Sequence, residues 1–274
     1  MIPFTKAHAC GNDFLIVTEE AAAGHDRAIL ARQMCARNTG VGADGVEFFQ
    51  WTGTNAGRIR LHNADGSVAE ISGNGTRCVA AWMAEATGAR PGDELQIETD
   101  AGLRISSVIA VDASRGYRVD VRTGMGIPVV KQRAVRLSDR AEIEGAEIST
   151  GNPHFVIVVG DEQFSVAGRP WQAVGEEICF HGDFPNQTNV ELVRVVNPRQ
   201  IEIRIFERGV GPTTSSGTGS SASAIAAISL HGCESPLEVV APGGSQTVSW
   251  QGEGTELYLT GPAALIARGE AWES

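Results

Sequence analysis

Short apolar runs alternate with polar turns along most of the chain, and only a few segments carry apolar residues at helical spacing. Runs rich in Val, Ile and Phe, such as 155–159 and 201–206, predict β-strands. Helices are predicted over about 26–37, 74–87, 170–179 and 217–230. Asp26 is a good N-cap for the first helix, and Gly88 is a good terminator for the second.

Further strands follow from the same apolar pattern and from the turn residues that separate the runs. They are predicted at 46–49, 58–62, 95–98, 103–105, 117–121, 189–196, 256–259 and 263–272, with a strand–turn–strand unit over 1–18 and a hairpin at Pro242-Gly243-Gly244. The last strand is expected to return to the first half of the chain. The pattern therefore predicts a mixed α/β (α+β) fold.

A short phrase occurs twice, as Ser-Gly-Asn-Gly at 72–75 and as Ser-Gly-Thr-Gly at 216–219. Each copy precedes an Ala-rich stretch that is expected to be helical. Two similar helix starts in the two halves suggest a duplicated domain. Glycine and proline cluster over 124–128, which marks the crossing between the halves. We therefore expect one domain over 1–120 plus 263–274 and a second over 121–262.

Composition narrows the class of protein. The 274 residues carry a formal net charge of −11, which argues against nucleic acid and against an anionic membrane surface. No apolar run approaches the roughly 18–20 residues of a membrane span, and no signal peptide is visible. The five cysteines are odd in number and scattered, which is typical of a reducing cytoplasm.

The sequence lacks the residue patterns that several common cofactors need. Its two lysines, Lys6 and Lys131, stand outside any glycine-rich or site-like context, so pyridoxal phosphate chemistry is not expected. The histidines and cysteines show no metal-ligand spacing, and no Gly-Lys-Ser/Thr phosphate loop occurs. We expect neither cofactor nor metal.

The two repeated phrases set glycines at helix N-termini. The first N–H groups of a helix lack intrahelical partners, and the helix dipole favours negative charge there. Glycine lets a ligand approach this backbone closely. Four asparagines lie in turns or at strand ends, from which their side chains can converge on a cleft: Asn12, Asn63, Asn152 and Asn189. The pattern indicates a site for a small polar ligand with a carboxylate.

At these residues the chain closely resembles the diaminopimelate epimerases, a family of cofactor-independent amino-acid epimerases. The matching stretches are 8–14, 63–67, 73–78, 151–154, 188–191, 207–211 and 217–219, and they follow the family order along nearly the whole chain. The resemblance implies two pseudo-symmetric domains, each a central helix wrapped by mostly antiparallel sheet. It also implies an active site in the cleft between the domains.

The resemblance assigns roles as well. The family's acid and base positions are Ser72 and Ser216 here, and His154 and Glu207 would tune them. The substrate-binding residues implied are Asn12, Asn63, Gly73, Asn74, Asn152, Asn189, Glu207, Arg208, Gly217 and Thr218. The implied reaction is epimerisation of an amino acid at its α-carbon, from LL- to meso-diaminopimelate, a lysine and peptidoglycan precursor, by two-base proton transfer.

The chain departs from the family at the acid and base positions. The family has a cysteine at each of them, whereas this chain has a serine at each. A serine hydroxyl is a weaker acid than a thiol by roughly six pKa units, so forming the alkoxide costs about 8 kcal/mol more. His154 or Glu207 would then have to act as the base through the serine. Serine is also among the best helix N-caps, so Ser72 and Ser216 have a purely structural interpretation.

Three functions remain open. The first is the epimerase itself, working through a Ser/Ser pair. The second is another isomerase or a dehydratase on the same scaffold. The third is a catalytically impaired or Cys-to-Ser substituted homologue that binds the amino acid without turnover. In each case we expect a small-molecule amino-acid ligand, a cytoplasmic protein, and no nucleic acid or membrane partner; a homodimer is a further hypothesis.

Overall fold

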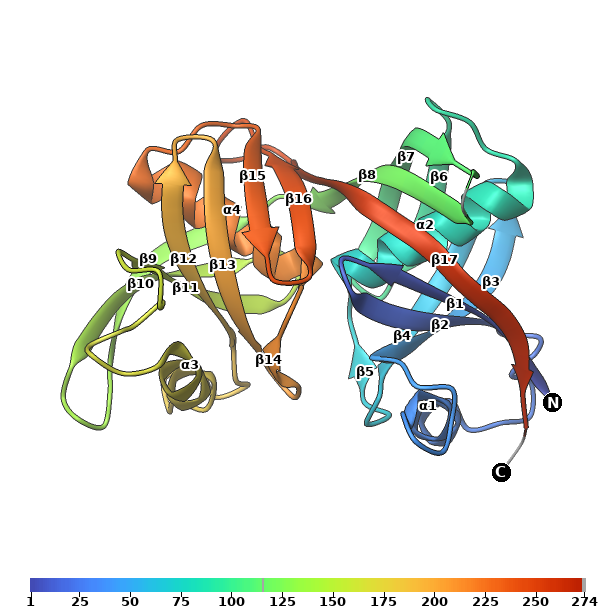
Figure 1. Cartoon of the computed structure of the whole chain (residues 1–274), viewed down its shortest axis with the longest axis horizontal. Helices are drawn as coiled ribbons and strands as arrows, with labels where there is room; N and C mark the ends of the chain where they lie inside the picture. Colours follow the sequence, from blue (N-terminus) through green and yellow to red (C-terminus); the bar gives the residue numbers. More distant parts are fainter. Residues whose placement is uncertain (115, 273–274) are drawn as a thin grey trace. The chain divides into compact units, whose positions relative to one another are not determined.

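The computed structural model describes residues 1–114 and 116–272. The chain divides into two compact units: unit 1 is Met1–Gly124 with Thr260–Ser274, and unit 2 is Met125–Leu259. Each unit wraps strands around one long helix, which is α2 (Gly73–Thr87) in unit 1 and α4 (Gly217–His231) in unit 2 (Figure 1). None of the helices in the described residues is long and apolar enough to cross a membrane.

Unit 1 is built from nine strands and the helices α1 (Arg27–Cys35) and α2. Its strands are β1 (Ile2–Ala9), β2 (Asn12–Thr18), β3 (Gly45–Gly53), β4 (Ala56–Asn63), β5 (Val68–Ala69), β6 (Glu94–Thr99), β7 (Gly102–Asp112), β8 (Tyr117–Gly126) and most of β17 (Leu257–Ala271). The pairs β1–β2, β3–β4, β6–β7 and β7–β8 are antiparallel, whereas β2–β3 and β4–β6 are parallel.

Unit 2 follows the same order with its own elements. It contains β9 (Val129–Arg136), β10 (Glu142–Ser149), β11 (Pro153–Val159), α3 (Trp171–Cys179), β12 (Asn189–Asn197), β13 (Gln200–Glu207), β14 (Gly211–Thr213), α4, β15 (Leu237–Ala241) and β16 (Gly244–Ser249). The pair β11–β12 is parallel, like β2–β3, and β13–β15 is parallel, like β4–β6. The predicted duplication and its mixed, mostly antiparallel sheets are therefore confirmed.

The two central helices begin and end as local chemistry predicts. Ser72 is the N-cap of α2 and Ser216 is the N-cap of α4, both in extended backbone. Gly88 ends α2 and Gly232 ends α4, each in the left-handed conformation that glycine adopts readily. Most residues of both helices are buried, and most of the buried residues of α4 are small (Gly, Ala, Ser), so the surrounding strands can approach the helix closely.

Around α2, unit 1 has a core of Phe, Leu, Ile, Val and Ala side chains from both the helix and the strands. Unit 2 has a second core, in which α3 packs on β12 and β13 and contributes Val174 and Ile178.

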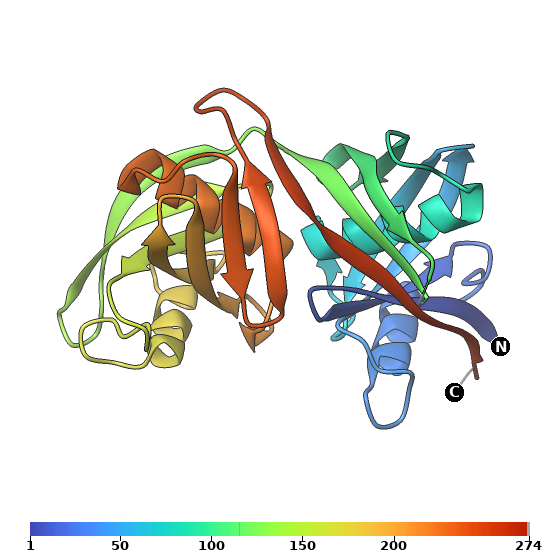
Figure 2. The same cartoon turned by 45° about the horizontal axis from the view of Figure 1, so that its top comes forward.

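Three details differ from the sequence prediction. Two strands were expected at the C-terminus, but β17 is one continuous strand whose ladder with β1 starts at Ala264, beyond Pro262. Figures 1 and 2 both show β17, in dark red, running beside β1, in dark blue. The strands β9 and β10 were missed because charged and polar residues interrupt their apolar positions, so neither contains a continuous apolar run. Pro170 is the N-cap of α3 and not its first helical residue.

Candidate active site

The start of α2 is organised by Ser72. Its Oγ accepts a hydrogen bond from the Gly75 N–H at 3.0 Å, and its carbonyl oxygen accepts one from Thr76 Oγ1 at 2.8 Å. The capping interpretation of Ser72 is therefore correct. A hydroxyl that accepts a hydrogen bond still has its own proton to donate, so capping leaves Ser72 able to exchange a proton.

A chain of amides leads to the same helix end in unit 1. Asn12 donates through Nδ2 to Asp44 Oδ2 at 2.6 Å and accepts through Oδ1 from Asn74 Nδ2 at 3.2 Å. The fully buried Arg77 donates to Asn74 Oδ1 at 2.6 Å. Asn63 is not part of this chain, since it donates to Ser67 Oγ in its own turn at 3.0 Å. Asn12 and Asn74 are thus fixed together beside Ser72.

The start of α4 in unit 2 repeats this arrangement with Ser216. Its Oγ accepts from the Gly219 N–H at 3.2 Å and lies 3.4 Å from Thr218 Oγ1. The Ser216 side chain is almost fully buried, whereas that of Ser72 is half-buried. Both helices therefore present a serine hydroxyl at the end where backbone N–H groups lack helical partners.

A buried polar relay leads from β12 to the start of α4. Glu191 Oε1 lies 2.7 Å from His154 Nδ1, and His154 Nε2 lies 2.9 Å from Asn152 Oδ1. Asn152 in turn donates through Nδ2 to Thr218 Oγ1 at 3.3 Å. Three of the predicted site residues (Asn152, His154 and Thr218) are thereby joined, together with Glu191.

The relay fixes where its protons lie. Because Asn152 uses its NH₂ group on Thr218, its Oδ1 must accept, and His154 Nε2 carries a hydrogen. One proton is then shared by His154 Nδ1 and Glu191, either as an imidazolium with a carboxylate or as a neutral pair. Burial raises the pKa of Glu191, and the charge of His154 opposes that rise. The pair therefore holds one transferable proton.

The remaining predicted side chains of unit 2 lie where β12 begins and where β13 ends. Asn189 donates through Nδ2 to the Pro153 carbonyl at 3.1 Å and accepts through Oδ1 from the Arg208 N–H at 2.9 Å. Arg208 donates to the Asn186 carbonyl at 3.1 Å. Glu207 is the last residue of β13 and directly precedes Arg208. Asn189 thus ties the turn that bears Glu207 and Arg208 to the start of β11.

Two glutamates were missed as site residues by sequence reasoning. Glu47 is fully buried in β3 beside α2, and Glu191 is fully buried in β12 beside α4. Burial raises the pKa of Glu47 to about 8. A signal for both was available, because each carboxylate interrupts an apolar strand run, as in Val46-Glu47-Phe48.

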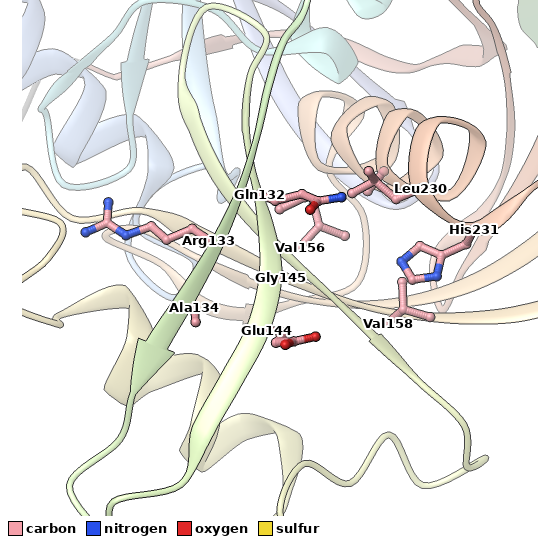
Figure 3. Close-up of a pocket in the computed structure, with 11 residues that line it drawn as sticks. Gln132, Arg133, Ala134, Glu144, Gly145, Val156, Val158, Leu230 and His231 are labelled. Atoms are coloured by element: carbon pink, nitrogen blue, oxygen red, sulfur yellow. The ribbon is translucent and has the colours of Figure 1, made fainter.

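A pocket lies at the other end of α4. This cavity of about 500 Å³ is lined by side chains that include Glu144, Val156, Leu230 and His231 (Figure 3). Leu230 and His231 stand at the C-terminal end of the 15-residue helix, which is about 20 Å long, and Ser216 caps its N-terminal end. The predicted site residues do not line this pocket. No group of three His, Cys, Asp or Glu side chains that could hold a metal was found among residues 1–114 and 116–272.

The fold is shared with isomerases and related proteins of known structure. A hydroxyproline epimerase from Agrobacterium vitis superposes with a TM-score of 0.73 at 16% identity, over 98% of this chain and 91% of that one. A phenazine biosynthesis protein of the PhzF family from Bacillus anthracis superposes with a TM-score of 0.71 at 16% identity, over 100% and 99% of the two chains. Two duplicated units, each with strands wrapped around a central helix, thus define the fold class that this chain shares with these proteins.

Within that class, the chain belongs to the diaminopimelate epimerase family, whose sequence model matches residues 4–129 and 147–266. The diaminopimelate epimerase of Desulfitobacterium hafniense is 36% identical over 281 aligned residues, which cover 96% of each chain. That of Moorella thermoacetica is 36% identical over 284 aligned residues, which cover 97% of this chain and 98% of the relative.

Proposed function

We propose that this chain epimerises LL-diaminopimelate to meso-diaminopimelate at one α-carbon, without a cofactor. The observation that carries the proposal is near full-length similarity to curated diaminopimelate epimerases in a chain with a hydroxyl at both helix starts. The product class is a precursor of lysine and peptidoglycan. All five cysteines are free and buried, which supports a cytoplasmic setting for this reaction.

Inversion at a carbon needs one group that removes the α-proton and a second that returns a proton to the opposite face. Ser72 and Ser216 are the matching groups of the two units. Deprotonation develops negative charge on the substrate carboxylate, which the N–H groups of a helix start stabilise. The backbone N–H groups of Gly73 and Asn74 in unit 1, and of Gly217 and Thr218 in unit 2, are the donors we assign to this role.

A serine hydroxyl needs help to accept the α-proton at neutral pH. In unit 2 we assign that help to the buried His154–Glu191 pair, which holds one proton, and Asn152 and Thr218 fix its geometry beside Ser216. Because this pair can take up the proton of the Ser216 hydroxyl, a free serine alkoxide does not have to form.

The test is solvent exchange. Purified protein and LL-diaminopimelate are incubated in D₂O, and we expect deuterium at the α-carbon together with formation of the meso isomer, followed by mass spectrometry and chiral chromatography. The Ser72→Ala/Ser216→Ala variant is the matched control and is expected to exchange nothing while it remains folded. Wild-type protein that binds the substrate but exchanges no α-proton after long incubation would refute the epimerase.

One observation favours a second candidate, an amino-acid-binding protein without turnover. Both Ser72 and Ser216 already use their oxygens as N-caps, which is a sufficient structural reason for serine at these positions. This candidate predicts that diaminopimelate raises the melting temperature of the protein without isotope exchange. The same incubation therefore separates the two functions.

A further inference from the structure

Glu47 is a buried carboxyl group that the relay in unit 2 does not include. Its side chain is fully buried, and neither carboxyl oxygen has a hydrogen-bond partner among the residues that the structure describes. An unsatisfied buried carboxyl group destabilises a fold, so its presence calls for an explanation.

The strand registers make Glu47 the counterpart of Glu191. The parallel pair β2–β3 aligns Ile16 with Glu47, and the parallel pair β11–β12 aligns Val156 with Glu191. Two residues before the aligned position, unit 2 has His154 and unit 1 has Phe14. The duplication has thus kept the glutamate in both units and the histidine in one only.

The carboxyl group of Glu47 is aimed at the start of α2. A Cβ atom added to Gly75 would lie 2.0 Å from Glu47 Oε1 and 3.2 Å from Ser72 Cβ. In unit 2, a Cβ added to Gly219 would lie 2.8 Å from Glu191 Oε1 and 3.3 Å from Ser216 Oγ. The second glycine of each repeated phrase therefore leaves the space in which carboxyl and serine approach each other.

We propose that Glu47 is the proton-accepting group of unit 1 and acts on the Ser72 hydroxyl through one water. The inference rests on the proposed function. As the substrate Cα–H bond breaks, its proton passes to Ser72 Oγ, the Ser72 hydroxyl proton passes to the water, and the water gives a proton to the Glu47 carboxylate. The electron pair of the broken bond stays on the substrate as an enolate-like carbanion.

The return step uses unit 2. Ser216 gives its hydroxyl proton to the opposite face of the carbanion, and the proton shared by His154 and Glu191 replaces it. Glu47 has then gained one proton and the His154–Glu191 pair has lost one. Catalysis in the reverse direction, or exchange with solvent, restores both. Glu47 is a positioning and proton-holding residue here, because Ser72 is the group that touches the substrate.

The surroundings of Glu47 are suited to this role. Its register partners Ile16 on β2 and Leu61 on β4 are apolar, and the titratable group of α2 that interacts with it is the Cys78 thiol. Burial is the cause of its raised pKa, about 8, which lies close to the pH at which a general base works best. Arg77, Asp13 and Cys10 act on Cys78 in turn.

The test compares Glu47→Gln with wild type in the D₂O exchange assay. Glutamine keeps the shape of the side chain but cannot accept the proton, so we expect the exchange rate to fall at least ~100-fold. The substrate-dependent rise in melting temperature should remain unchanged. The wild-type rate should increase with pH through about 8, and the variant should lose this increase. Glu47→Asp should recover part of the rate.

The exposed Glu94→Gln on β6 is the matched control and should behave as wild type. A Glu47→Gln protein that exchanges within threefold of wild type, with the same pH profile, would overturn the inference. A folded variant with unaltered ligand binding but a lost rate rules out a merely structural role.

A second measurement keeps the inference testable if the epimerase proposal itself fails. In Ser72→Cys, the alkylation rate of the new thiol reports its pKa, and Glu47→Gln in the same background should lower that pKa by removing a negative neighbour. Ser216→Cys with Glu47→Gln is the control and should show no change. An unchanged thiol pKa at position 72 would contradict proximity of Glu47 to the Ser72 side chain, whatever the substrate of the protein is.

Discussion

His154 Nδ1 lies 2.7 Å from Glu191 Oε1, and both side chains are fully buried. Because His154 Nε2 is committed to Asn152, this contact contains the one proton that the relay can move. The same contact decides the electrostatics of unit 2, since an isolated carboxylate at the position of Glu191 would be costly to bury.

Removing the histidine tests that balance. We expect His154→Leu to destabilise the protein by about 3–5 kcal/mol at pH 8, because Glu191 loses its partner while still buried. The cost should be smaller at pH 5, where the raised pKa of Glu191 allows the carboxyl group to become neutral. Urea unfolding at the two pH values measures this. Equal costs at pH 5 and pH 8 would show that Glu191 is already neutral in wild type.

The two roles of Ser72 can be separated by substitution. Ser72→Ala should lower the free energy of unfolding by about 1 kcal/mol, whereas Ser72→Gly should lower it by only a few tenths, because glycine is a tolerated N-cap. Both variants lack the hydroxyl, so both should lose isotope exchange equally. Urea unfolding and D₂O exchange on the same preparations check the two expectations. Exchange rates that follow stability would contradict a chemical role.

Thiols at the two helix starts should raise activity. A thiol is more acidic than a serine hydroxyl by several pKa units, so less free energy is needed to form the proton-accepting state. We expect Ser72→Cys/Ser216→Cys to exchange the α-proton at least ~100-fold faster than wild type, and each single variant to fall between the two. Initial rates of deuterium incorporation measure this. A folded, ligand-binding double variant with the wild-type rate would mean that oxygen does not limit turnover.

Local chemistry made part of this structure predictable from sequence. The N-caps Ser72 and Ser216 and the C-cap Gly88 depend on residues within one helical turn, and the repeated phrase exposes the duplication. The resemblance to a known family supplied the remaining candidates, of which Asn152 and His154 prove to be joined by a hydrogen bond.

The role of Glu47 could not be predicted in the same way. Its neighbours come from β2, about 30 residues earlier in the chain, and from α2, about 30 residues later. Only the strand register shows that Glu47 and Glu191 are counterparts, and that Phe14 stands where His154 does. The apolar run around Glu47 indicates a buried carboxylate, but it does not show which helix that carboxylate faces.

The space at the second glycine of each phrase can be filled. Gly75→Ala should destabilise unit 1 by about 1–3 kcal/mol, because the new methyl group would lie 2.0 Å from Glu47 Oε1. Gly219→Ala should cost less, since the corresponding distance to Glu191 Oε1 is 2.8 Å. Glu47→Ala removes the carboxyl group, so Gly75→Ala should destabilise the protein much less in that background than in wild type. A double-mutant cycle measures this coupling. Additive costs would contradict the contact.

The pH dependence of stability provides a separate view of Glu47. Its pKa is raised from 4.5 to about 8 in the folded protein, so the folded state binds the proton more tightly than the unfolded state does. Stability from this group is therefore fully present below pH 4.5 and is lost as pH rises towards 8, by about 5 kcal/mol in total. Above pH 8 this carboxyl group adds no further change.

Glu47→Gln cannot ionise, so the free energy of unfolding of wild type relative to the variant should fall across this window. The exposed Glu94→Gln should instead run parallel to wild type. Urea titrations at pH 5, 6.5 and 8 distinguish these outcomes, and parallel curves for wild type and Glu47→Gln would mean that Glu47 is ionised at an ordinary pKa.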